Sequence, residues 1–141
     1  MIYKKALVCT DFNEKNDQLL LRAIERTKKE GTTIHLCHVI KPVAAISINY
    51  YYYPLSIDME TEALKMAEEK MKESLANLKL PTEQGRVFFG DPKSDIIREA
   101  EKLSADVIIL AGTSHSTLGM LGSVADYVIN NAKCDVLVLR G

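Results

Sequence analysis

The stretch from Gly90 to Gly112, GDPKSDIIREAEKLSADVIILAG, contains a helix pattern followed at once by a buried-strand pattern, and this succession decides the fold. Between Ser94 and Ser104 the apolar side chains recur at three- and four-residue steps, which predicts an amphipathic helix. The run from Asp106 to Ala111 is apolar, β-branched and does not alternate with polar residues. Strands that are covered on both faces of a sheet have this composition. The stretch therefore predicts one helix and one central strand of a parallel sheet.

The rest of the chain repeats this alternation. Four more runs have the composition of buried strands: Ala6–Cys9, Thr33–Ile40, Arg86–Phe89 and Asp135–Leu139. Helical periodicity fills the gaps, with a first helix capped by Asn16 or Asp17 and stopped at Gly31, a second from Ser56 to Leu80, and a last one after Ser123. Alternating strands and helices favour right-handed crossovers that place helices on both faces of a parallel sheet. We therefore predict the α/β class: a single domain with a five-stranded parallel sheet and helices on both faces.

Composition and charge exclude several kinds of partner. The chain has 141 residues, 47% of them apolar, which is enough for the core of one ordinary domain. Its 18 basic and 19 acidic side chains leave a net charge of -1, so we expect no nucleic-acid partner and no binding to an anionic membrane surface. No run is long enough to span a bilayer, and the start MIYKKALVCTDF lacks the apolar core and the small-residue cleavage site that are typical of a signal peptide. We expect a cytoplasmic protein.

The cysteines and histidines do not form a metal-binding pattern. Cys9, Cys37 and Cys134 are widely spaced and lie within or beside apolar runs, which is typical of buried, reduced thiols. His35 and His38 lie three residues apart in one predicted strand, so they point to opposite faces of the sheet. We expect packed or dimer-facing histidines and no metal site.

Ligands of such folds bind beyond the carboxyl ends of the strands, where the strand order reverses. The loop from Gly112 to Gly122 follows a predicted strand and is rich in glycine and hydroxyl side chains. A helix that begins at Ser123 would offer unpaired N–H groups to an anion. No Lys or Arg lies between Gly112 and Ala132, and the loop is not a P-loop. The alternative is purely structural, with glycines that make turns and Ser123 as an N-cap.

The order and spacing of four segments resemble the universal stress protein family. The segments are LVCTDF at Leu7–Phe12, LCHVI at Leu36–Ile40, GDPKSDIIREAEKLSADVIILAG at Gly90–Gly112, and LGSVADYVINNAKCDVLVLR at Leu121–Arg140. The resemblance covers nearly the whole chain and implies one universal stress protein domain over residues 1–141, with a Rossmann-like five-stranded parallel sheet similar to the one that the periodicity predicts. Members of the family are commonly dimers that pair through the last strand, which implies a homodimer through Asp135–Leu139.

The nucleotide-binding branch of this family carries Gly, two residues, Gly, nine residues, and then Gly-Ser or Gly-Thr. Gly112 matches the first glycine, and Gly122 with Ser123 matches the last pair, whereas His115 occupies the position of the second glycine. Nine residues separate Gly112 from Gly122, where the family pattern has twelve. The resemblance implies a nucleotide site with these residues: Thr10, Asp11, Val39, Ala111, Gly112, His115, Gly122, Ser123 and Val124.

Two functions remain open from the sequence. The first, implied by the resemblance, is a stress-response dimer that binds ATP or AMP, with Mg²⁺ as a possible accompanying ion, and signals to an unknown protein partner. The second is a non-binding member of the family that acts as a protein-interaction dimer, for which the loop with Tyr50–Tyr53 offers a contact surface. No catalytic triad or paired acid stands out, so we expect no enzyme, and at most slow nucleotide hydrolysis with Asp11 as the nearby acid.

Overall fold

The computed structural model describes residues 3–42, 53–112 and 122–140, and for residues 53–58 it describes the backbone alone. It contains five parallel strands: β1 (Lys5–Cys9), β2 (Thr33–Ile40), β3 (Gly85–Phe89), β4 (Val107–Ala111) and β5 (Asp135–Leu139). The strand order is β3-β2-β1-β4-β5. The predicted five-stranded parallel sheet is confirmed. Each strand ends at the predicted residue and begins within one residue of the predicted start.

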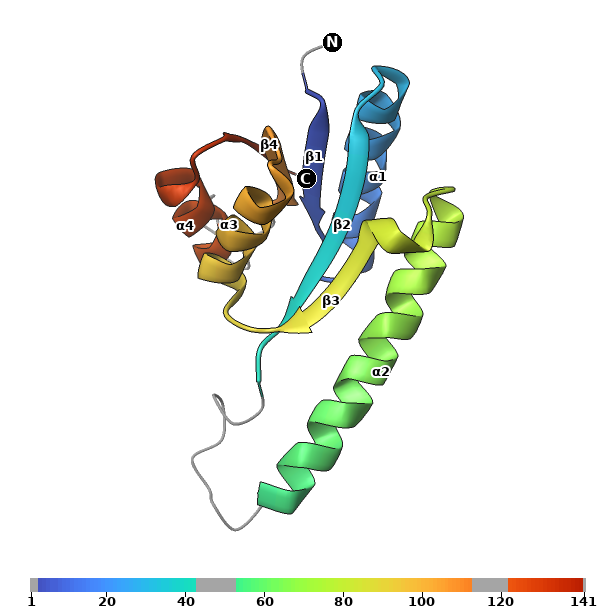
Figure 1. The fold of residues 1–141 in the computed structure, drawn as a ribbon, viewed down its shortest axis with the longest axis vertical. Helices are drawn as coiled ribbons and strands as arrows, with labels where there is room; N and C mark the ends of the chain where they lie inside the picture. Colours follow the sequence, from blue (N-terminus) through green and yellow to red (C-terminus); the bar gives the residue numbers. More distant parts are fainter. Residues whose placement is uncertain (1–2, 43–52, 113–121, 141) are drawn as a thin grey trace.

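Helices cover both faces of the sheet (Figure 1). They are α1 (Glu14–Lys29), α2 (Tyr53–Asn77), α3 (Pro92–Leu103) and α4 (Ser123–Asn131), and a short 3-10 helix, η3 (Thr82–Gln84), precedes β3. Side chains of α1 and α2 share one apolar core with one face of the sheet, and side chains of α3 and α4 share a second core with the other face. Among the described residues no helix is long and apolar enough to cross a bilayer.

Strand β1 shows why the strands read as unbroken apolar runs. Ala6 and Val8 face the core beneath α1 and α2, whereas Leu7 faces the core beneath α3 and α4. All three side chains are fully buried. Because both faces are covered, no polar residue alternates with them, and each large side chain contributes about 1.5–3 kcal/mol of burial free energy.

The predicted helix starts were partly wrong. Helix α1 is capped by Asn13 and not by Asn16 or Asp17, since the Asn13 side chain accepts hydrogen bonds from the amides of Lys15 and Asn16. The cap therefore lies one turn earlier than predicted, at the first amide-bearing side chain after β1. Helix α4 begins at Ser123, but its N-cap is Gly122, so Ser123 is the first helical residue.

The helix ends also differ in part from the prediction. The stop after α1 is confirmed, because Gly31 has φ 88°, a left-handed conformation that suits glycine. Helix α2 runs from Tyr53 to Asn77 and ends before the predicted Leu80, because Lys79 adopts φ 56° and turns the chain out of the helix. Helix α3 begins at Pro92, two residues before the predicted start, with Asp91 as its N-cap.

The strand order reverses between β1 and β4, which is where open α/β sheets bind ligands. After β1 the chain passes through α1 to β2 on one side, and after β3 it crosses through α3 to β4 on the other side of β1. The order of the strands therefore reverses between β1 and β4. In open α/β sheets, ligands bind outside the carboxyl ends of the strands at this position.

Candidate functional site

The turn between β1 and α1 is held by Thr10. Its hydroxyl donates a hydrogen bond to the Asp17 carboxylate at 2.8 Å and accepts one from the Phe12 amide at 3.0 Å. Phe12 has φ 59°, a left-handed conformation that is unfavourable for a bulky residue and persists only where the surroundings hold it. The predicted site residue Thr10 is therefore buried, and its hydroxyl is engaged within the turn, where it shapes the backbone that leads to Asp11.

His38 connects the end of β2 to this turn. Its Nδ1 lies 2.7 Å from the carbonyl oxygen of Thr10, so Nδ1 carries the proton and donates. Its ring packs on the Phe12 ring with centroids 4.5 Å apart, and the Lys70 ammonium lies 5.9 Å from the Phe12 centroid. The sequence predicts His38 only as a packed or dimer-facing histidine. The role of His38 and Phe12 depends on the pairing of β1 with β2, which their positions in the sequence do not reveal.

Asp11 is exposed and firmly oriented. One carboxylate oxygen accepts a hydrogen bond from the Asn13 amide and the other accepts one from the Asn16 side chain, both at 2.9 Å. Each carboxylate oxygen can accept more than one hydrogen bond. Asp11 therefore presents a fixed acceptor at the carboxyl end of β1, as the prediction of a binding residue requires.

The charged form of Asp17 is destabilised by its partial burial in the turn. Partial burial raises the pKa of its carboxyl group above the ordinary value, and the negative charge of Asp11 adds to the shift, whereas the hydrogen bond from Thr10 opposes it. Asp17 and Thr10 border a cavity of about 170 Å³ between α1, α2 and the sheet, with mostly leucine and isoleucine walls. The hydrogen bond from Thr10 therefore compensates in part for the burial of this carboxylate.

Val39 presents an open pair of backbone groups. The Cys37 carbonyl accepts from the Thr10 amide on the β1 side, and the Ile40 carbonyl accepts from the Gly90 amide on the β3 side. Backbone groups alternate along a strand, so the N–H and C=O of Val39 point toward β1, past Cys9, where the β1–β2 pairing ends. Among the described residues no hydrogen bond to these two groups is found.

The end of β4 and the start of α4 form the wall of the candidate site on the other side of β1 from Val39. Ala111 is the last residue of β4, and the buried Gly112 amide donates to the Leu139 carbonyl at 2.7 Å, so it extends the β4–β5 ladder. Among the described residues, nothing lies within 4 Å of where a Cβ atom on Gly122 would be. The first helical hydrogen bond of α4 runs from the Asp126 amide to Gly122, which leaves the preceding amides, including those of Ser123 and Val124, outside the helical ladder.

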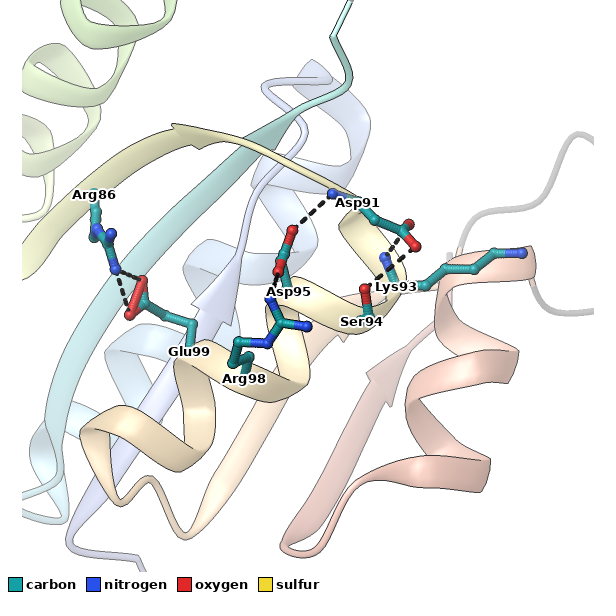
Figure 2. Close-up of polar contacts among 7 residues, drawn as sticks. All are labelled: Arg86, Asp91, Lys93, Ser94, Asp95, Arg98 and Glu99. Atoms are coloured by element: carbon teal, nitrogen blue, oxygen red, sulfur yellow. Dashed lines mark hydrogen bonds and ion pairs between the residues drawn. The ribbon is translucent and has the colours of Figure 1, made fainter. Parts of the chain in front are cut away.

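Charges near this wall are mixed. Asp126 lies in the first turn of α4, where its exposed carboxylate opposes a bound anion. Helices α3 and α4 are neighbours and both begin at the carboxyl edge, so Lys93, in the first turn of α3, adds a positive charge there. Figure 2 shows its side chain extending away from Asp91 and Asp95. The predicted site residue His115 lies outside the described residues, as do Tyr50–Tyr52.

A second polar cluster lies between β3 and α3 (Figure 2). Arg86 donates to both carboxylate oxygens of Glu99, at 2.7 and 2.5 Å, and its guanidinium packs 4.7 Å from the Phe88 ring centroid. The Glu99 side chain is only 4% exposed, so Arg86 neutralises a buried charge. Sequence reasoning missed this pair. The available signal was that Glu99 falls on the apolar stripe of the helix between Ile96 and Leu103.

The described residues contain no group of three or more His, Cys, Asp or Glu side chains arranged to hold a metal ion. They contain instead an exposed acceptor at Asp11, the open backbone pair of Val39, and the unpaired amides at the start of α4. These groups suit a ligand with a hydrogen-bonding ring edge at one end and an anionic group at the other.

Comparison with known proteins agrees with this architecture. The sequence model of the Universal stress protein family matches residues 2–140. Universal stress protein A homolog 1 of Coxiella burnetii is 28% identical over 140 residues, which cover 99% of this chain and 97% of that protein.

Solved structures show the same fold. The universal stress protein UspA from Lactobacillus plantarum has a TM-score of 0.82 at 20% identity and covers 98% of both chains. A universal stress protein in complex with cAMP has a TM-score of 0.66 at 19% identity and covers 98% of this chain and 97% of its own. The names of these relatives denote no enzymatic activity.

Proposed function

The chain belongs to the universal stress protein family, and we propose that it binds an adenine nucleotide between the carboxyl ends of β1 and β4. The observation that carries the proposal is the open backbone pair of Val39, which faces the gap where the β1–β2 ladder ends. Backbone groups inside a sheet are usually paired, and Val39 is half-buried at the end of β2, so its open pair beside the switch point is available to a ligand that completes the pairing. An adenine ring edge, with a ring-nitrogen acceptor beside an amino donor, matches an N–H and a C=O on one strand.

The sugar and phosphate would lie toward β4 and α4. The oriented Asp11 carboxylate accepts hydrogen bonds from ribose hydroxyls or from the adenine amino group. The N–H groups at Ser123 and Val124 and the helix dipole favour a phosphate, and the bare Gly122 lets it approach the backbone closely. Ala111 and Gly112, at the end of β4, lie on the same side, and His115, outside the described residues, is proposed as a further contact.

The ligand choice is ATP or AMP, and the site favours the smaller anion. The loop from Gly112 to Gly122 is three residues shorter than the family pattern, so it has fewer amides to surround a triphosphate. Asp126 adds a negative charge beside the helix start. The solved family member in complex with cAMP shows that this fold can hold an adenine nucleotide with a single phosphate group. Mg²⁺ would accompany only a triphosphate, with Asp11 as the nearby carboxylate.

We propose further that residues 1–141 work as one cytoplasmic regulatory domain that signals nucleotide binding without turnover and pairs as a homodimer through β5. Leu137 on β5 and Ile129 on α4 are 39% and 44% exposed, and an apolar edge strand of this kind is suited to pairing with a second copy. A protein partner would then read the state of the nucleotide site. The alternative is a family member that binds no nucleotide and acts through its dimer surface alone.

The first test identifies any nucleotide that the purified protein carries. The protein is denatured, the released small molecules are identified by mass spectrometry, and the native protein is titrated with ATP, AMP and cyclic AMP in a thermal-shift assay. We expect a bound adenine nucleotide and a melting temperature that rises with nucleotide concentration, because a ligand that binds only the folded state stabilises it. Absence of both, for all three nucleotides, would support the protein-interaction alternative.

Two matched variants on α4 sharpen the test. Gly122→Asp introduces a preferred N-cap side chain that occupies the free amides and repels phosphate, so it should remove the nucleotide-dependent shift without loss of stability. Asp126→Asn removes the exposed charge from the same turn and should increase the shift. Equal shifts in wild type and both variants would place the phosphate elsewhere and contradict this assignment.

A further inference from the structure

Two cysteines on neighbouring strands face each other beside the proposed nucleotide site. The Sγ atoms of Cys9 and Cys37 lie 3.6 Å apart, and the two residues are direct partners in the β1–β2 register. Adjacent strands are about 4.8 Å apart, which lies within the range of Cα separations that a disulfide bridges. Cys134 directly precedes β5, at the amino end of the sheet, whereas Cys9 lies at the carboxyl end of β1.

We propose that Cys9 and Cys37 form a reversible intramolecular disulfide when the protein meets a peroxide oxidant. Their position in the sheet makes closure possible. Cys9 with Cys37 is the last pair of the β1–β2 ladder, so the strand ends beyond it are joined by fewer hydrogen bonds than the strand centre. Closure requires the sulfur atoms to approach from 3.6 Å to about 2.05 Å, which side-chain rotation and a small shift of the strand ends supply.

The difference in exposure between Cys9 and Cys37 sets the order in which the two thiols react. Cys9 is partly exposed as a residue, whereas Cys37 is 1% exposed, so we assign the first reaction with a small peroxide to Cys9. The Cys9 sulfur attacks one peroxide oxygen, the O–O bond breaks, and Cys9 becomes a sulfenic acid as water leaves. The Cys37 sulfur then attacks the Cys9 sulfur, the S–O bond breaks, and the hydroxyl leaves as water with the Cys37 proton. The two thiols lose two electrons in total, and the peroxide gains them.

The surroundings make this pair slow to oxidise and easy to reduce. The contact with the Cys37 thiol and burial raise the pKa of Cys9 well above its ordinary value, which keeps the thiolate fraction small. Strand partners about 4.8 Å apart are closer than the common Cα separation of about 5.5–6 Å in disulfides, so the bridge is strained, and strained disulfides have the higher reduction potentials of labile, regulatory bridges. The pair therefore responds to sustained oxidation and is restored by ordinary thiol reductants.

The bridge would act directly on the β1–α1 turn. Thr10 follows Cys9, its amide donates to the Cys37 carbonyl, and its own carbonyl accepts from His38 beside Cys37. Any shift of Cys9 relative to Cys37 therefore moves Thr10 and the Asp11 carboxylate relative to β2. This effect on nucleotide binding depends on the proposed function, whereas formation of the bridge does not.

The experiment counts thiols after oxidation of the folded protein. Wild type, Cys134→Ser and Cys37→Ser are treated with hydrogen peroxide, the peroxide is removed with catalase, and the chains are unfolded in N-ethylmaleimide before intact-mass analysis. The wild type has three cysteines, so we expect one alkylated thiol after oxidation and three after dithiothreitol. Cys134→Ser should keep none, with the loss of two hydrogens in mass, and peptide mapping should join Cys9 to Cys37.

The control variants make the outcome decisive. Cys37→Ser should form no intramolecular bridge and should trap oxidised Cys9, and Cys9→Ser, at the more exposed position, serves if Cys37→Ser does not fold by circular dichroism. The proposal is overturned if Cys134→Ser keeps both thiols alkylatable after peroxide treatment. It is equally overturned if the wild-type bridge contains Cys134, or if Cys9 accumulates as sulfinic or sulfonic acid while Cys37 stays reduced.

Discussion

The two ends of the sheet use hydrogen-bonding groups in opposite ways. At the amino end, the Asp106 carboxylate accepts from the amides of Lys4 and Lys5, at 2.9 and 2.7 Å, which ties the start of β4 to the start of β1. The Thr32 hydroxyl donates to the Tyr3 carbonyl at 2.9 Å. Side chains at this end close backbone groups that the strands leave open.

At the carboxyl end, Thr10 and His38 close some backbone groups, but others stay open. The N–H and C=O of Val39 have no partner among the described residues, Gly122 has free space where a side chain would lie, and Phe12 holds a left-handed conformation. Open backbone groups and local strain lower stability unless a ligand compensates, and they are typical of functional sites. The difference between the ends therefore separates the residues that stabilise the fold from those that we assign to binding.

The largest expected effects come from two glycines at opposite ends. In Gly85→Ala, at the amino end of β3, the added Cβ would clash with the Leu75 side chain and lie 3.0 Å from Met71, so overpacking should destabilise the protein by about 1–3 kcal/mol. Nucleotide affinity of the folded protein should not change. Gly122→Asp should do the reverse, with stability retained and affinity lowered by about tenfold or more through loss of charge-assisted bonds.

Urea unfolding and calorimetric titration with AMP measure the two effects of this glycine pair separately. Loss of AMP affinity in Gly85→Ala, measured where the variant is folded, would show that the two ends of the sheet are coupled. It would contradict the division between stability at one end and binding at the other.

A threonine pair tests the same contrast with a smaller change. Thr10→Val removes the donor to Asp17 and the acceptor for the Phe12 amide, which should cost about 1–3 kcal/mol and lower the affinity for AMP, because the turn that orients Asp11 loosens. Thr32→Val removes one hydrogen bond and should cost about 0.5–1.5 kcal/mol without an effect on affinity. The same two measurements apply. Identical affinities in the two variants would mean that the turn does not contribute to binding.

The smallest effects concern two aspartates and the pH dependence of stability. The amides of Lys4 and then Lys5 lower the pKa of Asp106 below its ordinary 3.8, so its stabilising contribution is present above pH 3.8 and is lost as the pH falls through the lowered pKa. Burial raises the pKa of Asp17 above 3.8. Its contribution is therefore greatest below pH 3.8 and is lost as the pH rises through the raised pKa.

Asp106→Asn should flatten the acid limb of a curve of urea midpoint against pH, and Asp17→Asn should raise the midpoint at neutral pH. Both changes are small because water screens these partly exposed groups. A steeper acid limb in Asp106→Asn, or a lower neutral midpoint in Asp17→Asn, would contradict the assigned shifts.

Much of the site could be predicted only in outline. Asp11, Gly122 and Ser123 follow strands or precede a helix, and their residue types alone mark them as candidates at the carboxyl edge. Thr10 was predicted as a binding residue, yet its hydroxyl is engaged by Asp17 and Phe12. Its hydrogen bond to Asp17 depends on how α1 leaves β1, because the two residues meet only after the chain turns through Asn13.

The sequence alone determined the α/β class, the five strands and the faces of the helices. A strand that is buried on both faces and a helix that is buried on one face each require a local, periodic pattern of apolar residues. The tertiary structure alone decided the strand order β3-β2-β1-β4-β5, the contact of Cys9 with Cys37, and the direction of the open Val39 backbone. These features join segments that are distant in the chain, and the free energy that selects them comes from packing between elements, which no local pattern records.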